Sequence, residues 1–325
     1  MPTFACRSQM LFCRGFAKLA RVPQCYSPSK LLLKLVEVGP RDGLQNEMSI
    51  IPTEIKVSLI NQLTEAGLQF VEVSSFVNPK WVPQLADALQ VFRQIKRCSL
   101  TRYSALVPNI QGFMDALEAK PDEVAVFTAA SETFAKRNIN CSIDESIKRF
   151  DEVLHLAKSK AIPVRGYVSC ALGCPYEGSV SPDAVARVAE LLWNIGCYEI
   201  SLGDTVGRGT PESMNRLLTV MLTQGGACPR EAVAVHCHDT AGNALANIGV
   251  ALDHHGIRVV DSAIGGLGGC PYAGPDAPGN VATEAVVRYV LDKGYILSSN
   301  LKLEQLIATS VWIRSKLRKS SWSSN

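Results

Sequence analysis

The sequence lacks a large excess of either charge over the part that is expected to fold. Among its 325 residues, six Lys and Arg precede the first acidic residue, Glu37. From Glu37 onward 27 basic residues face 30 acidic ones, a net charge of −3. The part expected to fold therefore has no basic excess to suggest nucleic acid or an anionic membrane as a partner. We therefore expect neither as a partner.

The sequence also lacks a dinucleotide-binding motif and an even set of cysteines. No G-x-G-x-x-G follows the first apolar run, Leu32 to Val38, which removes the main reason to expect a dinucleotide-binding fold. The 11 Cys are an odd number in a long chain. We therefore expect free thiols in a reducing compartment rather than a disulfide framework.

The first 30 residues contain no acid but mix Arg and Lys with Phe, Leu, Met and Ser. This is the composition of a mitochondrial transit peptide, and its apolar stretches are too short and interrupted for a secretory core or a membrane anchor. We expect residues 1–30 to be a removable address to the mitochondrial matrix. A basic tail without a targeting role is the alternative.

From residue 32 onward, short β-branched runs alternate with longer amphipathic stretches. The expected strands are Leu32–Val38, Phe70–Ser74, Tyr103–Val107, Glu123–Phe127, Val164–Cys170, Tyr198–Leu202, Ala232–His236 and Val259–Ile264. The expected helices, whose apolar residues return every three or four positions, include Pro52–Ala66, Pro83–Lys96, Asp144–Ser159, Pro182–Ile195, Pro211–Leu222, Gly242–His255, Ala282–Lys293 and Leu301–Leu317.

Eight strand and helix alternations over roughly 250 residues predict an α/β fold, a (β/α)8 TIM barrel. We assign residues 31–310 to a catalytic barrel domain that includes additional C-terminal helices, and residues 311–325 to a basic, Ser-rich tail. A doubly wound open sheet is the competing fold.

Polar residues follow the ends of the predicted strands, which in a barrel form the face that carries the active site. The strongest local signal is His236 and His238, because residues two apart on a strand point the same way. Asp42 can join them across the barrel mouth, with Asn280 as an amide oxygen donor. This donor set predicts an octahedral site for Mg²⁺ or Mn²⁺ with positions open for substrate oxygens.

Two further side chains suggest chemistry at that site. Arg41 would place a fixed positive charge where an enolate develops; its alternative role is a salt bridge to Glu37 or Glu72, and we expect Glu37 to hold it. Cys270 lies in the Gly-rich run Gly265–Tyr272, where a thiol on a movable loop could deliver a proton and close the site. Alternatively, these glycines only pack a loop beneath a phosphate.

Seven motifs, in order, make the chain resemble the hydroxymethylglutaryl-CoA lyase family of the mitochondrial type between about residues 32 and 310. They are Val38–Glu47 (VGPRDGLQNE), Ser74–Gln84, Asn138–Ser142, Arg165–Gly178, Ser201–Thr205, Val235–Thr240 and Gly265–Tyr272. Members of this carbon-carbon lyase family, of the oxo-acid-lyase class, cleave 3-hydroxy-3-methylglutaryl-CoA to acetoacetate and acetyl-CoA. The reaction serves leucine catabolism and ketone-body formation.

The resemblance implies a TIM barrel that binds one divalent cation and no organic cofactor, acts on a small-molecule CoA thioester and forms a homodimer. The implied metal ligands are Asp42, His236, His238 and Asn280. The implied catalytic residues are Arg41 for the enolate, Cys270 on the mobile loop, and Glu72, Asp204 and His236 for proton transfer. The implied substrate-binding residues are Arg41, Ser75, Asn138 and Tyr167.

Two departures from the family pattern concern the end of the chain. Pro271 to Asn280 is one residue longer than usual and has two additional prolines, which could stiffen the loop or shift Asn280. The family's common Cys-Lys-Leu type ending is absent. The functional alternatives are a condensing synthase of the same superfamily, such as an isopropylmalate or homocitrate synthase, and a metal-stabilised binding barrel without catalysis. Only 45 residues follow Asn280, whereas such synthases usually carry a sizeable C-terminal regulatory region.

Overall fold

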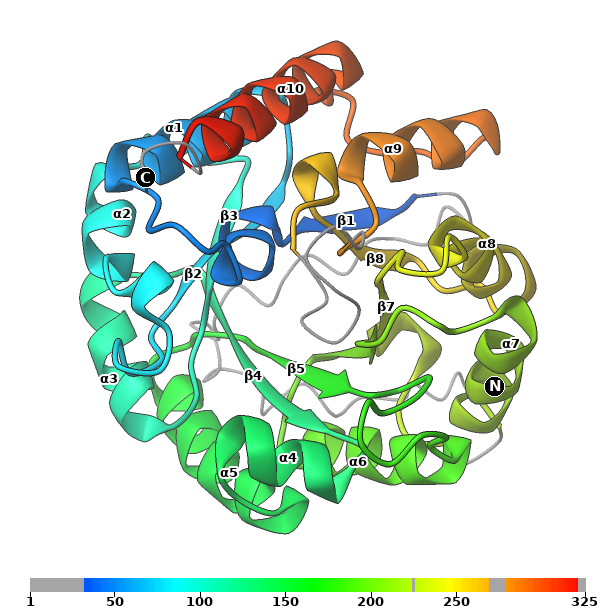
Figure 1. Ribbon diagram of the computed structural model, residues 1–325. Helices are drawn as coiled ribbons and strands as arrows, with labels where there is room; N and C mark the ends of the chain where they lie inside the picture. Colours follow the sequence, from blue (N-terminus) through cyan, green and yellow to red (C-terminus); the bar gives the residue numbers. More distant parts are fainter. Residues whose placement is uncertain (1–31, 224–225, 269–278, 321–325) are drawn as a thin grey trace, which may run out of the picture.

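The computed structural model describes residues 32–223, 226–268 and 279–320, and in these ranges eight parallel strands close into one barrel (Figure 1). The strands follow one another around the barrel in chain order, and β8 pairs with β1 to close it. They are β1 (Lys34–Glu37), β2 (Phe70–Ser75), β3 (Arg102–Leu106), β4 (Glu123–Ala129), β5 (Val164–Ser169), β6 (Glu199–Asp204), β7 (Val233–Cys237) and β8 (Val259–Ser262). The predicted TIM barrel is confirmed, and the open sheet is excluded.

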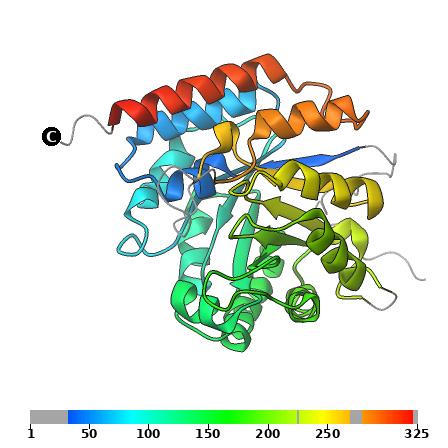
Figure 2. The same ribbon diagram turned by 45° about the vertical axis from the view of Figure 1, so that its right-hand side comes forward.

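Helices surround the barrel on its outer side (Figures 1 and 2). They are α1 (Thr53–Glu65), α2 (Ala88–Gln94), α3 (Ile110–Ala119), α4 (Glu132–Ile139), α5 (Ile143–Ser159), α6 (Pro182–Asn194), α7 (Pro211–Met221), α8 (Ala244–Gly249), α9 (Thr283–Asp292) and α10 (Leu303–Ser320). Their starts follow from local chemistry. In α5, for example, Ser142 and Glu145 form a reciprocal capping box that satisfies two otherwise unpaired N–H groups.

The helix pattern differs from the expected one in two places. The stretch Pro83–Lys96 divides into a 3₁₀ turn at Pro83–Leu85 and the short helix α2. Helices α3 and α4 were not among the amphipathic stretches identified. In the short helix α4 only Phe134 and Ala135 are buried, so its sequence has too few apolar residues to show a helical repeat.

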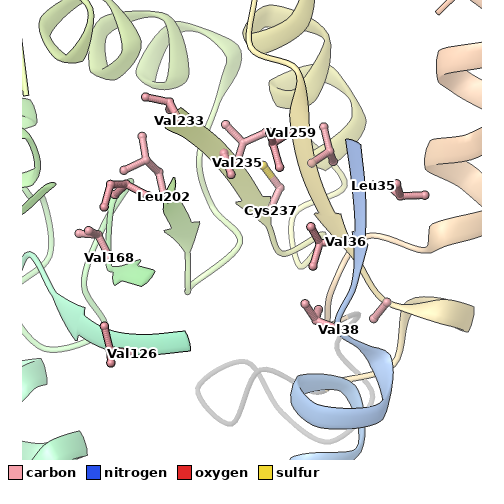
Figure 3. Close-up of a cluster of buried hydrophobic side chains, with 14 of the residues drawn as sticks. Leu35, Val36, Val38, Val126, Val168, Leu202, Val233, Val235, Cys237 and Val259 are labelled. Atoms are coloured by element: carbon pink, nitrogen blue, oxygen red, sulfur yellow. The ribbon is translucent and has the colours of Figure 1, made fainter. Parts of the chain in front are cut away.

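The core combines apolar side chains of the strands, which Figure 3 shows for Leu35, Val126, Val168, Leu202 and Val235, with apolar side chains of the surrounding helices. Both faces of these strands are covered, because the barrel interior lies on one side and the helices lie on the other. This explains why each strand reads as a nearly continuous apolar run. Burying each Val or Leu side chain contributes about 1.5–3 kcal/mol.

The last helix, α10, lies alongside α1 and next to α9 (Figures 1 and 2). Leu306 and Ile313 on its inner face are fully buried, so this helix is packed against the barrel at least as far as residue 313. None of the helices in the described part of the chain is long and apolar enough to cross a membrane. The expected leader (residues 1–30) and Cys270 lie outside the described residues.

Candidate active site and metal centre

A single turn of π-helix, η1 (Gly39–Gly43), delivers Arg41 and Asp42 to the mouth of the barrel directly after β1. The carbonyl of Val38 accepts the N–H groups of Arg41, Asp42 and Gly43, at 3.2, 2.7 and 3.1 Å. A side chain at Gly39 would collide with the Glu37 carboxylate, and one at Gly43 would collide with Leu267. The Gly-Pro-Arg-Asp-Gly sequence therefore fits a turn that is packed on both sides.

Asp42, His236 and His238 converge at this mouth, and their ligand atoms all lie within 4.8 Å of one another. Asp42 Oδ2 is 3.8 Å from His236 Nε2 and 3.9 Å from His238 Nε2, too far for direct hydrogen bonds of normal length. Two ligands of one ion at about 2.05 Å are separated by about 2.9 Å when adjacent and about 4.1 Å when opposite. The two separations from Asp42 fall within that range, so the carboxylate and each histidine are spaced as ligands of a single cation.

The orientation of the His236 ring is fixed from behind by Asp261 on the neighbouring strand. The strand register places these two residues opposite each other, and His236 Nδ1 lies 3.2 Å from Asp261 Oδ2. Although burial would raise the pKa of Asp261, Arg165 and His236 hold that pKa well below its usual value. The ionised carboxylate can only accept, so Nδ1 is the donor of this pair and Nε2 faces Asp42, an arrangement common to metal-binding histidines.

His238 is also suited to bind a metal in its neutral form. Burial, with His236 close by, lowers the pKa of His238 to about 4, so its imidazole is uncharged at neutral pH. Its Nδ1 is buried and has no hydrogen-bond partner among the described residues, while Nε2 faces Asp42. Metal coordination requires a neutral imidazole, which both histidines can supply.

Asp42 and Asn280 complete the donor set. Burial would raise the pKa of Asp42, but Arg41 and the two histidines hold it well below the usual range, so the residue is a carboxylate. Asn280 is 2% exposed, and its Nδ2 donates to Asp42 Oδ2 at 2.8 Å and to the Leu267 carbonyl at 3.1 Å. The longer preceding segment thus leaves Asn280 at the site. Its amide oxygen points away from Asp42, however, and a half-turn of the amide would bring the oxygen to the ligand position.

Arg41 is held by two carboxylates. Its Nε donates to Glu72 and its Nη1 donates to Asp42 Oδ1 at 2.6 Å. Burial would lower the pKa of Arg41, but Glu72 and Asp42 raise it, so the guanidinium stays charged. On the far side of Glu72, the Tyr167 hydroxyl donates to Oε2 at 2.7 Å.

The expectation that Glu37 holds Arg41 is wrong. The Glu37 carboxylate accepts the backbone N–H groups of Gly39 and Ile264, both at 2.8 Å, and the Thr283 hydroxyl at 2.6 Å. These contacts join the end of β1 to the end of β8 and to the first turn of α9. They occupy both carboxylate oxygens, so Glu37 braces the barrel closure.

Three other candidate residues have distinct placements. Ser75 is buried, and its hydroxyl accepts the N–H of Val77 at 3.2 Å. Asp204 is also buried and accepts the N–H groups of Gly207 and Gly209 at 3.0 and 2.9 Å. Neither side chain lines the cavity, whereas Asn138, exposed on α4, does.

A cavity of about 980 Å³ opens above the Asp42 and histidine group. Arg41, Tyr167, His236 and His238 line its inner part, and apolar side chains, including Leu106 and Phe127, line its middle. Towards α4 and α5 the lining becomes basic, through Lys136, Arg137 and Arg149. The volume lies at the upper end of the range for small-molecule sites, and the charge distribution suits a long ligand with an anionic end.

Two residues behind the site were missed from the sequence. Asp261 fixes His236, and Arg165 contacts Asp261 and Tyr167. Each is a single charged residue within an apolar strand run, and each is 1% exposed. A buried charge needs a partner. An isolated charged residue in a strand predicted to be buried was therefore the feature by which both residues could have been identified from the sequence.

Comparisons with known proteins agree with this geometry. The family model described as HMGL-like matches residues 32–313. The chain is 54% identical over 289 residues to a cytoplasmic 3-hydroxy-3-methylglutaryl-CoA lyase of Mus musculus, covering 89% of this chain and 82% of that protein. It is 53% identical over 287 residues to a mitochondrial hydroxymethylglutaryl-CoA lyase of Bos taurus, with coverages of 88% and 86%.

Solved structures show the same similarity. The HMG-CoA lyase of Brucella melitensis superposes with a TM-score of 0.85 at 46% identity, covering 89% of this chain and 99% of that one. An HMG-CoA lyase of Acinetobacter baumannii, solved in complex with coenzyme A and 3-methylmalate, gives a TM-score of 0.83 at 35% identity, with coverages of 90% and 93%.

Proposed function

The chain belongs to the HMGL-like family, and from this premise we infer that it is a carbon-carbon lyase that cleaves 3-hydroxy-3-methylglutaryl-CoA to acetoacetate and acetyl-CoA. One observation supports the inference most directly. Asp42, His236 and His238 form a three-residue donor group beside the buried guanidinium of Arg41, at the carboxyl end of a TIM barrel. A binding barrel without catalysis would not need a charged arginine held at the donor group.

We propose that the donor group holds Mg²⁺ or Mn²⁺ through Asp42, His236, His238 and the amide oxygen of Asn280. The fit rests on the ionised carboxylate of Asp42 and on the uncharged imidazole of His238, whose Nε2 faces Asp42. When bound, a divalent cation would supply Lewis acidity to the substrate's tertiary hydroxyl and carboxylate, lowering the pKa of that hydroxyl.

Arg41 is assigned to the enolate of the departing acetyl-CoA. Its guanidinium is positioned by Glu72 and Asp42 before the negative charge develops, so little reorganisation is required. Preorganised donors of this kind contribute about 3–4 kcal/mol to transition-state stabilisation in related situations.

Proton transfers are assigned to the groups around Arg41 and the cavity wall. The Tyr167 hydroxyl lines the cavity and is hydrogen-bonded to Glu72, so the pair offers a route for the proton of the substrate hydroxyl. Asp204 contributes by shaping the Thr205–Gly209 loop, because its carboxylate is engaged by that loop's backbone. Cys270 stays our proposed proton donor to the enolate carbon on the basis of its Gly-rich motif.

The substrate is assigned to the cavity with its acyl end at the metal centre and its nucleotide end at the basic rim. Asn138 lies on the same part of α4 as Lys136 and Arg137, so it is placed to contact the CoA moiety. Tyr167 would contact the acyl end. Ser75 would act through Val77, a cavity residue whose N–H it holds.

We further propose that the enzyme is a homodimer of the mitochondrial matrix. The relatives include enzymes named mitochondrial as well as enzymes named cytoplasmic, so the acid-free leader is what favours the matrix. Import into isolated mitochondria with shortening of the chain is the expected result. A full-length product that stays outside would refute this location.

The activity is tested with purified protein beginning near residue 31. With Mg²⁺ or Mn²⁺ it should release acetoacetate from hydroxymethylglutaryl-CoA, and EDTA should abolish the release. Condensation of acetyl-CoA with a keto acid, in place of cleavage, would assign the chain to the synthases. Metal binding without either reaction would support the binding barrel.

A further inference from the structure

Two carboxylates inside the barrel contact residues of the proposed active site, and hydrogen bonds link both carboxylates to one arginine. Asp261 binds Nδ1 of His236, and Glu72 binds Arg41. Arg165 on β5 donates to Asp261 through two nitrogens, Nη2 at 2.6 Å and Nη1 at 3.0 Å. The same Nη1 donates to the Tyr167 hydroxyl at 2.7 Å, which in turn donates to Glu72.

The position of Arg165 is unusual because its contacts cross the barrel. Strands β5 and β8 are not neighbours, so the ion pair between Arg165 and Asp261 runs through the interior. The third nitrogen, Nε, donates to Glu199 Oε1 at 2.7 Å on the adjacent strand β6. All three nitrogens are therefore engaged, and the residue is 1% exposed and does not line the cavity.

Because the Arg165 guanidinium can only donate, it determines which atoms donate and which accept in the hydrogen bonds that Tyr167 and Asp261 make. Arginine has donors only and stays protonated. Because Tyr167 accepts from Arg165, its own proton is free to go to Glu72, which orients the carboxylate that holds Arg41. Because Asp261 accepts from Arg165, its contact with His236 at 3.2 Å favours a ring proton on Nδ1, and in the neutral imidazole Nε2 then carries the lone pair.

We propose that Arg165 is a positioning residue that sets two features of the site together, the metal-binding tautomer of His236 and the placement of Arg41. It acts through Asp261 in the first case and through Tyr167 and Glu72 in the second. The part that concerns turnover rests on the proposed lyase function, whereas the part that concerns metal binding does not.

The geometry also explains why another cation would not serve. The planar guanidinium reaches three partners at once: Nε donates to Glu199, Nη1 and Nη2 donate to Asp261, and Nη1 also donates to Tyr167. A lysine ammonium is a single point on a flexible stem. It could pair with one of these groups but could not hold Asp261 and Tyr167 simultaneously.

The test uses Arg165→Lys and Arg165→Met, with Asp261→Asn as a nearly isosteric second variant. Mn²⁺ affinity is measured without substrate by EPR detection of free ion, and kcat and KM are measured by acetoacetate release. Lys34→Met is the matched control. It removes a cation that also pairs with Glu199, at 3.0 Å, but Lys34 lies at the start of β1, at the opposite end of the barrel from the site.

Losing a partner that orients a metal-binding histidine typically costs 10–100-fold in metal affinity or activity. We expect Arg165→Lys and Asp261→Asn to weaken Mn²⁺ binding by about 10-fold or more. Arg165→Lys should also lower kcat by at least about 10-fold, while KM changes by less than about two-fold because Arg165 does not touch the cavity. Lys34→Met should be less stable but should keep the Mn²⁺ affinity and kcat of the wild type.

A readout on the ring itself separates positioning from general packing. In the metal-free protein, ¹⁵N NMR of His236 should show the proton on Nδ1 in the wild type and in Lys34→Met, and this preference should be lost in Arg165→Lys and Asp261→Asn. If Arg165→Met fails to fold, the other two variants decide the question.

The proposal is overturned if folded Arg165→Lys or Asp261→Asn binds Mn²⁺ as tightly as the wild type with the ring proton unchanged. It is also overturned if Lys34→Met shows the same losses, since the effect would then be general to buried cations. A wild type that binds Mn²⁺ but does not cleave hydroxymethylglutaryl-CoA would refute the lyase function, and the metal affinities and ring protonation would still decide the role of Arg165.

Discussion

Replacing Arg41 by Met removes the cation that we assign to the developing enolate and leaves the three side chains of the proposed metal site in place. Arg41 is 7% exposed and Glu72 is 1% exposed, so the substitution leaves Glu72 with only the Tyr167 hydroxyl as a hydrogen-bond donor among the described residues. Breaking a buried ion pair in this way costs about 3–5 kcal/mol of unfolding free energy. Loss of the preorganised donor raises the barrier by about 3–4 kcal/mol, which is about 10²–10³ in kcat, and loss of the Glu72 orientation adds to this.

The assay compares acetoacetate release with Mn²⁺ affinity and with KM. We expect Arg41→Met to bind Mn²⁺ and substrate and to lose at least about 10²-fold in kcat. Arg41→Lys keeps the charge but cannot satisfy Glu72 and Asp42 from two nitrogens, so its loss should be intermediate. If folded Arg41→Met keeps kcat within about ten-fold of the wild type while metal is bound, the enolate role is wrong.

Three further predictions concern the metal, the barrel closure and the rim. His238→Ala should abolish tight Mn²⁺ binding while the protein stays folded, as measured by EPR and circular dichroism; a retained Mn²⁺ affinity would remove His238 from the donor set. Burial raises the pKa of Glu37 from 4.5 to about 7, so the folded protein binds the extra proton and its stability falls as pH rises from 4.5 through 7. Glu37→Gln mimics the protonated form, and urea unfolding should show the stability of the wild type falling relative to this variant between pH 5 and 8; a constant difference would contradict the shift. Arg137→Met should raise KM and reduce its dependence on salt with little change in kcat, whereas an unchanged KM over a salt series would argue against the basic rim as the nucleotide end.

Much of the fold could be predicted from sequence because buried parallel strands read as apolar runs. The positions of Arg41, Asp42, His236 and His238 at strand ends followed from the same pattern, since all strands of a barrel end at one face. To predict that these residues converge, only this topology and the alternation of side-chain directions along β7 were required.

The directions of individual side chains could not be read in this way. Asp204 follows a strand end as Asp42 does, yet its carboxylate turns back onto its own loop backbone. Glu37 differs from the expectation for the same reason, because its partners come from β8 and α9, more than 220 residues away. Arg165 and Asp261 meet across the interior from strands that do not pair, and no local spacing encodes such a contact.

The pairing of β1 with β8 also determines when, during synthesis, the chain can complete its proposed metal site. Asp42 follows the first strand, His236 lies near the end of the seventh and His238 just after it, and Asn280 follows the eighth. A growing chain therefore carries an incomplete donor set until nearly all of the barrel has left the ribosome. An ion bound at the proposed site would join the beginning of the domain to its end and would stabilise the closed barrel by mass action.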